Sequence, residues 1–171
     1  MSHLAPPSVR LLVCGNAERG DDGAALSAMA TLLPSLPSAM LERLEVRRCG
    51  HLRAEDLLVM PPGEMAVVVD AAAGVPPGHV VAVPFRTLAD KNGGPMPRSF
   101  LESGLESALA VVAAGRVGGL PDGVFIGIGG RRFGYGRPLS RSVRLAMVSF
   151  QRVIATELAR FAKVPGGPTA S

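Results

Sequence analysis

The sequence contains no tryptophan, one tyrosine and an aromatic fraction of only 4%. Proteins that bind single-stranded nucleic acid stack the bases on aromatic side chains, so this composition argues against a nucleic-acid partner. The formal net charge of +4 and the pI near 9.8 arise from arginines scattered along the chain. We interpret them as a solvated basic surface.

Long apolar runs and cysteine motifs are also missing. No run approaches the roughly 18 residues that a membrane-spanning helix needs, and residues 1–8 lack the pattern of a signal peptide. The two cysteines, Cys14 and Cys49, have no Cys-x-x-Cys spacing. We therefore expect a cytoplasmic protein with no membrane partner, whose cysteines are reduced and form neither a disulfide nor a zinc site.

Glycine is abundant, with 21 residues, but the nucleotide-binding glycine motifs are absent. No Gly-Lys-Ser or Gly-Lys-Thr follows the first glycine-rich loop, and the spacing of a dinucleotide fingerprint is not found. A nucleotide- or anion-binding module thus remains only a third hypothesis for this chain.

The length of 171 residues predicts one domain, with a core over about residues 9–162, a flexible leader and a flexible tail. Short apolar runs typical of buried strands cover residues 9–14, 65–70 and 123–128, and a more amphipathic strand is expected at 44–49. Helices are expected from residue 24 to Pro34, around 54–59, over 100–114 and over 140–162, where Ser140 is a plausible N-cap. Alternating strands and helices predict an α/β fold, a three-layer α/β/α sandwich with a mixed, mostly parallel sheet of about five strands.

One further strand is expected at residues 79–84, and residues 86–98 are expected to form a surface loop. The connection from residue 71 to 78 is too short for a parallel crossover, so strands 65–70 and 79–84 are predicted to pair as an antiparallel hairpin. In that arrangement His79 begins near the rim at which Asp70 ends.

Acidic residues follow two of the predicted buried strands. Asp21 and Asp22 lie in the loop of residues 15–23, after the first strand, and Asp70 closes the strand at 65–70. Carboxylates from neighbouring strand ends can converge on a divalent metal such as Mg²⁺, Mn²⁺ or Ni²⁺. The alternative is that one of the loop aspartates caps the next helix and Asp70 only binds backbone amides.

Two other groups of residues suggest chemistry. Cys14 could act as a nucleophile with His51 as its base, although a cysteine on a core strand is more commonly inert packing. Residues 129–132, Gly-Gly-Arg-Arg, could bind an anion through backbone N–H groups and guanidinium forks, or form a tight turn with solvated arginines.

Taken together, a set of short motifs resembles the hydrogenase maturation protease family, whose members trim the C-terminal extension of the large subunit of nickel–iron hydrogenases. The resemblance covers about residues 9–160. In chain order the motifs are Gly15-Asn16, Gly20-Asp21-Asp22-Gly23, Val67-Val68-Val69-Asp70-Ala71, Gly127-Ile128 and Pro138-Leu139-Ser140.

The resemblance implies that Asp22 and Asp70 contact nickel already inserted in the substrate and are the catalytic and metal-contacting carboxylates. It places Asn16, Gly20, Asp21 and Gly23 as the supporting residues of the loop. The family also has a histidine at this site, but in the matching stretch of this chain Leu101 stands in its place.

Because leucine cannot bind a metal, His51 or His79 is a possible replacement for the missing imidazole. The resemblance further implies an endopeptidase with no permanently bound cofactor, which recognises the nickel of its protein substrate, the hydrogenase large-subunit precursor. The alternative is a non-catalytic relative that binds a hydrogenase precursor or a maturation factor. The oligomeric state is not predicted.

Overall fold

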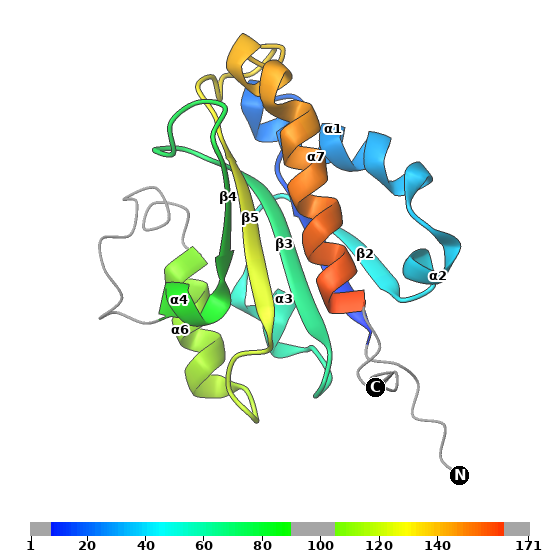
Figure 1. The fold of residues 1–171 in the computed structure, drawn as a ribbon. Helices are drawn as coiled ribbons and strands as arrows, with labels where there is room; N and C mark the ends of the chain where they lie inside the picture. The colour runs from blue at the N-terminus through cyan, green and yellow to red at the C-terminus, as the bar shows by residue number, and fades with distance from the viewer. Residues whose placement is uncertain (1–7, 90–104, 163–171) are drawn as a thin grey trace.

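The computed structural model describes residues 8–89 and 105–162, and its centre is a five-stranded sheet in the order β2-β1-β3-β5-β4 (Figure 1). The strands are β1 (Val9–Cys14), β2 (Leu44–Cys49), β3 (Met65–Ala72), β4 (Val80–Pro84) and β5 (Gly123–Gly129). The β1–β2, β1–β3 and β3–β5 pairs are parallel, and β4 runs antiparallel to β5. The predicted mixed, mostly parallel sheet is confirmed.

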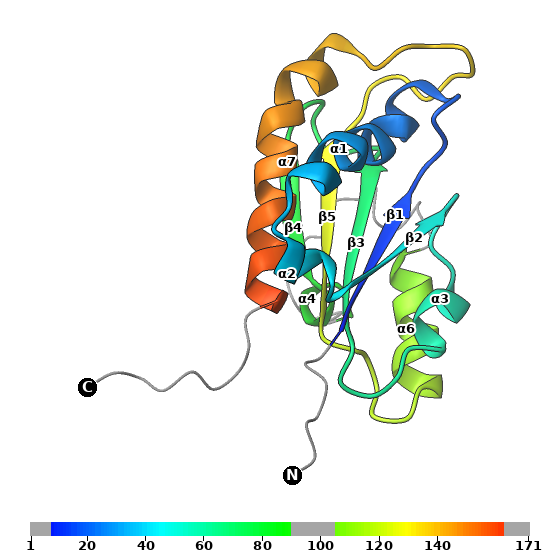
Figure 2. The same cartoon turned by 90° about the vertical axis from the view of Figure 1, so that its right-hand side faces the viewer.

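Helices cover both faces of this sheet, as the rotated view shows (Figure 2). On one face α1 (Ala24–Leu32) and α7 (Arg141–Ala162) pack against the sheet, with α2 (Ser38–Leu41) beside them. On the other face lie α3 (Ala54–Leu58), α4 (Phe85–Ala89) and α6 (Leu105–Gly115). Two hydrophobic clusters fill the space between the sheet and each helical layer, which confirms the predicted three-layer architecture.

Burial explains which strands are central. Every residue of β1 is buried, as are six of the seven residues of β5, because both faces of a central strand contact helices. Strands β2 and β4 form the two edges and are only partly buried. Pro84 lies in β4, where the missing N–H of proline is tolerated because one side of an edge strand has no partner.

The predicted hairpin between β3 and β4 is wrong, because β5 lies between these two strands. Gly127 of β5 is paired with Asp70 of β3 on one side and with Val81 of β4 on the other. The connection that follows β3 therefore passes the end of β5 before β4 begins (Figure 1). The physical reason is that the apolar strand β5 needs a partner on each side, whereas the half-exposed β4 suits the edge.

The helix boundaries agree with the sequence pattern in most places. Helix α1 ends before Pro34 and continues as a short 3-10 turn, η2 (Leu33–Ser35), and α7 begins one residue after Ser140. The expected loop over 86–98 is wrong for residues 86–89, which belong to α4, and its remainder lies outside the described residues. The predicted helix start at residue 100 also lies outside them.

The predicted leader and tail fall mainly on residues 1–7 and 163–171, which the structure does not describe. The assignment of a single domain over residues 1–171 stays a prediction. Within the described part of the chain, no helix combines the length and the apolar character required to cross a membrane.

Candidate functional site

The candidate site lies where β1 and β3 end side by side. The last residue pair of these parallel strands joins Val13 to Val69, so Cys14 and Asp70 are the next residues on each strand. The glycine-rich loop that follows β1 leads into a 3-10 turn, η1 (Gly20–Gly23), which contains both loop aspartates. Open α/β sheets bind ligands at this carboxyl edge of the strands.

Gly15 allows the loop and the end of β3 to approach each other. Its φ angle is +121°, which side chains other than glycine rarely adopt. A Cβ atom here would collide with the carbonyl oxygen of Asp22 and would lie 3.8 Å from Oδ1 of Asp70. The two predicted carboxylate residues are therefore brought together around a glycine that has no room for a side chain.

Asp22 is partly buried and is held by the loop itself. Its Oδ2 accepts the backbone N–H of Asn16 at 3.0 Å, and Oδ1 of Asn16 accepts the N–H of Glu18 at 2.9 Å. Asn16 therefore holds the carboxylate of Asp22 in place, and its supporting role in a site stays a prediction. Within the described residues, Oδ1 of Asp22 has no hydrogen bond.

The environment of Asp70 strongly shifts the pKa of its carboxyl group. Its pKa is raised from 3.8 to about 7. Burial is the largest cause and the negative charge of Asp22 also raises the pKa, whereas the hydrogen bond that Oδ1 accepts from the N–H of Ala71, at 2.8 Å, lowers it. The hydrogen bond to Ala71 is of the kind that the alternative interpretation of Asp70 expects. The charge of Asp22 thus contributes to the raised pKa of Asp70.

Asp21 binds backbone amides and does not cap the next helix. Neither loop aspartate caps α1, because the start of that helix receives no side-chain hydrogen bond. The fully buried carboxylate of Asp21 instead accepts the backbone N–H groups of Arg131, Arg132 and Ser140, at 2.8, 2.9 and 2.6 Å. Burial acts to raise the pKa of Asp21, but these three hydrogen bonds outweigh it and lower the pKa below 3.8.

These contacts also argue against the anion-binding alternative for residues 129–132. Gly129 donates its N–H to the carbonyl of His79, and Gly130 donates to that of Ala72. The two arginine amides both donate to Asp21. The N–H groups that could have bound an external anion are therefore occupied by the protein's own acceptors, and Asp21 takes the place of the anion.

The remaining loop glycines are in close contact with their surroundings, as a supporting role requires. Gly20 has a φ angle of +57°, and a Cβ atom there would lie 2.5 Å from the carbonyl oxygen of Arg132. A Cβ on Gly23 would lie 2.9 Å from Cα of Ala17. Both glycines allow the loop to pack against neighbouring backbone.

Cys14 is buried and free, and its sulfur lies 3.1 Å from that of Cys49, which is partly exposed and also free. The hydrogen bond with Cys49 and burial raise the pKa of the Cys14 thiol, and the same hydrogen bond lowers the pKa of Cys49. The sulfur partner of Cys14 is thus a second thiol. The structure gives no contact between Cys14 and His51.

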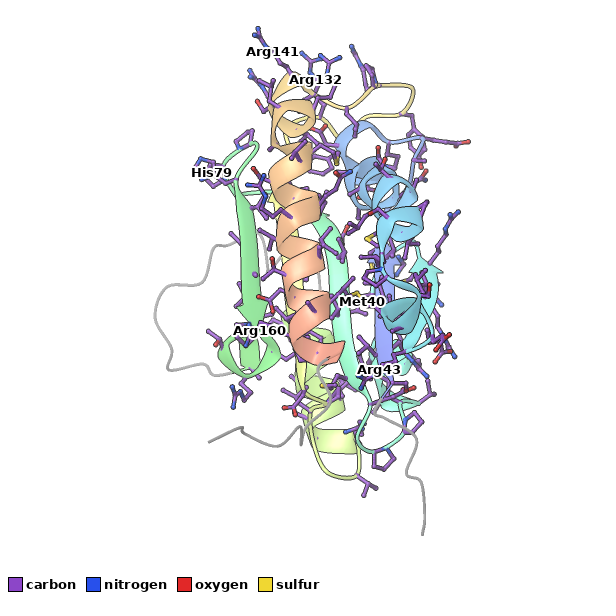
Figure 3. All side chains as sticks on the ribbon, turned by 45° about the vertical axis from the view of Figure 1, so that its right-hand side comes forward. Met40, Arg43, His79, Arg132, Arg141 and Arg160 are labelled. Atoms are coloured by element: carbon purple, nitrogen blue, oxygen red, sulfur yellow. The ribbon has the colours of Figure 1, made fainter. Side chains whose placement is uncertain are left out.

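The two candidate replacement histidines are exposed. His51 lies just beyond β2, two strands from Asp70, and His79 lies before β4 at the outer margin of the sheet (Figure 3). Among residues 8–89 and 105–162, no group of three or more histidine, cysteine, aspartate or glutamate side chains could hold a metal ion. Leu101 lies outside the described residues.

A groove of about 440 Å³ borders the same loop and is lined by Ala17, Gly20 and Gly23 on one side. Arg48 of β2 and Arg137 of the β5–α7 connection contribute to its walls. Neither Asp22 nor Asp70 lines this groove, so it is separate from the carboxylate pair. The candidate site is therefore the strand-end pair itself.

Comparison with known proteins finds no matching family model and no matching curated protein. Solved structures do match. The hydrogenase maturating endopeptidase HybD from E. coli has a TM-score of 0.66 at 17% identity, over 90% of this chain and 93% of that chain. The NiFe hydrogenase maturation protease HybD from Thermococcus kodakarensis has a TM-score of 0.58 at 22% identity, over 91% of this chain and 99% of that one.

The chain has the hydrogenase maturation protease fold. An endopeptidase from Escherichia coli agrees, with a TM-score of 0.62 at 18% identity over 91% of this chain and 94% of that chain. The fold expected from the motif resemblance is thus confirmed.

Proposed function

We propose that this protein is an endopeptidase that removes the C-terminal extension of a nickel–iron hydrogenase large-subunit precursor. The observation that carries the proposal is the pair of interacting carboxylates, Asp22 and Asp70, at the carboxyl edge of the sheet. The fold shared with solved hydrogenase maturation proteases supports it.

The electrostatics of the pair favour a cation. Asp70 has a pKa of about 7, because it is buried and lies near the negative charge of Asp22. A divalent ion between the two carboxylates would stabilise both in their ionised form, since an opposite charge favours the charged state. In our proposal the nickel is part of the substrate, and the two aspartates recognise it.

In this proposal, peptide hydrolysis depends on the position of the nickel in the substrate. A divalent ion polarises a carbonyl and lowers the pKa of a bound water. The role of Asp22 and Asp70 is to orient the nickel-loaded segment of the precursor and to position or activate a water at the scissile peptide bond. Asn16 supports this arrangement by fixing Oδ2 of Asp22 through its backbone N–H.

The test is incubation of the purified full chain with nickel-loaded and nickel-free precursor. We expect the wild type to release the extension from the nickel-loaded precursor only, and Asp22→Asn and Asp70→Asn to lose at least 100-fold in rate, as removal of a transition-state electrostatic contact does. Asp56→Asn is the matched control, because the carboxylate of Asp56, on α3, accepts the N–H of Arg53 and is not part of the proposed site.

Binding of the precursor without cleavage would contradict the endopeptidase and support the non-catalytic alternative. Calorimetry measures this directly, because a pure binder forms a stable complex and releases no peptide. Cleavage that Asp22→Asn and Asp70→Asn leave intact would place the active site elsewhere in the chain.

A further inference from the structure

The sulfur atoms of Cys14 and Cys49 are unusually close for two free thiols. The two residues end the neighbouring parallel strands β1 and β2 and are directly paired in the register of the sheet. Their sulfur atoms are 3.1 Å apart, and neither cysteine has another thiol partner in the described part of the chain. This pair takes no part in the proposed proteolysis.

The backbone geometry fits a disulfide without rearrangement. Neighbouring strands are about 4.8 Å apart, and disulfides join Cα atoms that are about 4.4 to 6.8 Å apart. A disulfide bond is about 2.0 Å long, so the sulfurs need to approach each other by only about 1 Å. The strands already hold the two residues side by side.

We propose that Cys14 and Cys49 form a site of reversible oxidation, at which a peroxide converts the two thiols into a disulfide that joins β1 to β2. The reduced pair is the state that the structure shows. The proposal is independent of the protease activity.

The two cysteines have different parts in the reaction. Cys49 is the partly exposed thiol and Cys14 is fully buried, so a small oxidant reaches Cys49 first. Its thiolate attacks one oxygen of hydrogen peroxide, the O–O bond breaks, and the products are a sulfenic acid and hydroxide. The peroxide is reduced and the sulfur of Cys49 is oxidised.

Cys14 completes the reaction. Its sulfur attacks the sulfur of the Cys49 sulfenic acid, the S–O bond breaks, and the hydroxide that leaves takes up the thiol proton as water. In sum, two thiols and one peroxide give one disulfide and two waters. A thiol reductant reverses the change by exchange.

The disulfide would be formed beside the candidate site. Gly15 directly follows Cys14, and its N–H is donated to the carbonyl oxygens of Cys49 and Gly50, at 3.1 and 3.0 Å. Cys14 also packs in the same cluster as Val68 and Ala72, which lie on either side of Asp70 on β3. Oxidation thus adds a covalent link where hydrogen bonds already join the loop to β2.

The test treats the full-length reduced protein with hydrogen peroxide, in the presence of a chelator, and then alkylates the remaining thiols. Trypsin separates the cysteines into residues 11–19 and 49–53, because Arg10, Arg19, Arg48 and Arg53 bound these peptides. We expect both thiols to disappear together and the two peptides to be recovered as one linked species that has lost two hydrogen atoms. Dithiothreitol should restore both free peptides.

Two variants separate the roles of Cys14 and Cys49 in the oxidation. Cys49→Ala should leave Cys14 as an unmodified thiol, because Cys14 is buried. Cys14→Ala should let Cys49 proceed to the sulfinic acid, which dithiothreitol does not reverse. The thermal midpoint of the wild type should rise on oxidation, because the link closes a loop of the unfolded chain, and neither variant should show this rise.

Three outcomes would overturn the proposal. The first is a wild-type chain in which Cys49 becomes a sulfinic acid while Cys14 stays a thiol. The second is a linkage found only between two chains on a non-reducing gel. The third is a folded chain that keeps both thiols under conditions in which the unfolded chain forms the disulfide.

Discussion

The buried carboxylate of Asp21 accepts the backbone N–H of Ser140 at 2.6 Å, although 119 positions of the chain separate the two residues. The same side chain accepts the N–H groups of Arg131 and Arg132. Ser140 directly precedes α7, and its carbonyl accepts the N–H of Arg144 in the first turn of that helix. Asp21 therefore ties the acidic loop to the connection that leads into α7, next to the residue that contacts the substrate metal in our proposal.

Replacing Asp21 should destabilise the protein more than its position in a loop suggests. In Asp21→Asn the amide NH₂ group has to face backbone donors, and a buried donor left without an acceptor costs about 1 to 3 kcal/mol. We expect the free energy of unfolding to fall by about 2 to 3 kcal/mol in urea titrations. Asp56→Asn, which affects a single exposed N–H contact, should lose less than about 1 kcal/mol.

The effect of Asp21 should depend on pH in a defined direction. The folded-state pKa is below the ordinary value of 3.8, so the ionised carboxylate stabilises the fold above that value. This stabilisation should disappear as the pH falls through the folded-state pKa. The gap in unfolding free energy between wild type and Asp21→Asn should accordingly be constant at neutral pH and shrink below pH 3.8; a gap that widens on acidification would contradict the assignment.

Asp70 should have the opposite pH dependence. Its pKa is raised from 3.8 to about 7, so the folded state holds a proton that the unfolded state has lost, and folding becomes less favourable as the pH rises between these values. Asp70→Asn should therefore be more stable than the wild type above pH 7, by up to about 4 kcal/mol, since each pKa unit corresponds to about 1.4 kcal/mol. Below pH 3.8 the two proteins should have nearly equal stability. Thermal unfolding at a series of pH values measures this difference.

The interaction between the carboxylates of Asp22 and Asp70 can be measured separately from the effect of burial. The charge of Asp22 is one of the causes that raise the pKa of Asp70. In Asp22→Asn the pKa of Asp70 should consequently fall below 7, although burial keeps it above the ordinary value. NMR titration of the Asp70 carboxyl carbon reports this value, and an unchanged pKa would mean that the side chains do not interact.

Gly15 should tolerate no side chain. Gly15→Ala puts a Cβ atom against the carbonyl oxygen of Asp22 at a φ angle of +121°, so both strain and a clash act on the loop. We expect a loss of stability of at least about 2 kcal/mol and loss of precursor cleavage. Gly63→Ala is the matched control, because Gly63 also has a positive φ, of +85°, but no atom lies within 4 Å of its Cβ position. The control should lose only about 1 kcal/mol and keep its activity.

Much of the fold follows from local sequence. The buried runs of β1, β3 and β5 identify the central strands. Asp22 lies in the loop that follows β1, and Asp70 lies two residues before the end of β3. The partner of β4 could not be found in this way. Its neighbour β5 begins at Gly123, far along the chain, and a short connection after β3 favours the wrong partner.

The donors to Asp21 could not be found for the same reason, since all three come from residues 131–140. A signal was nevertheless present, because the amides of residues 129–132, considered as a possible anion site, needed an acceptor and Asp21 lies between two glycines in a buried turn.

The proximity of Cys14 and Cys49 was also accessible in principle. Each ends a six-residue strand, and the helices α1 and α2 lie between the two strands along the chain, which places both cysteines at the same edge of the sheet. Cytoplasmic location and the absence of a resident cofactor stay predictions.

The insertion of β5 between β3 and β4 has a consequence for synthesis on the ribosome. Strand β4 is complete at Pro84, but the strand it pairs with does not begin until Gly123. While the intervening segment is made, β3 presents an unpaired edge and β4 has no neighbour, and such exposed edges invite association with other chains. The nascent protein should thus fold first as the parallel β2-β1-β3 unit, and the last strand to emerge should close the sheet on both sides at once.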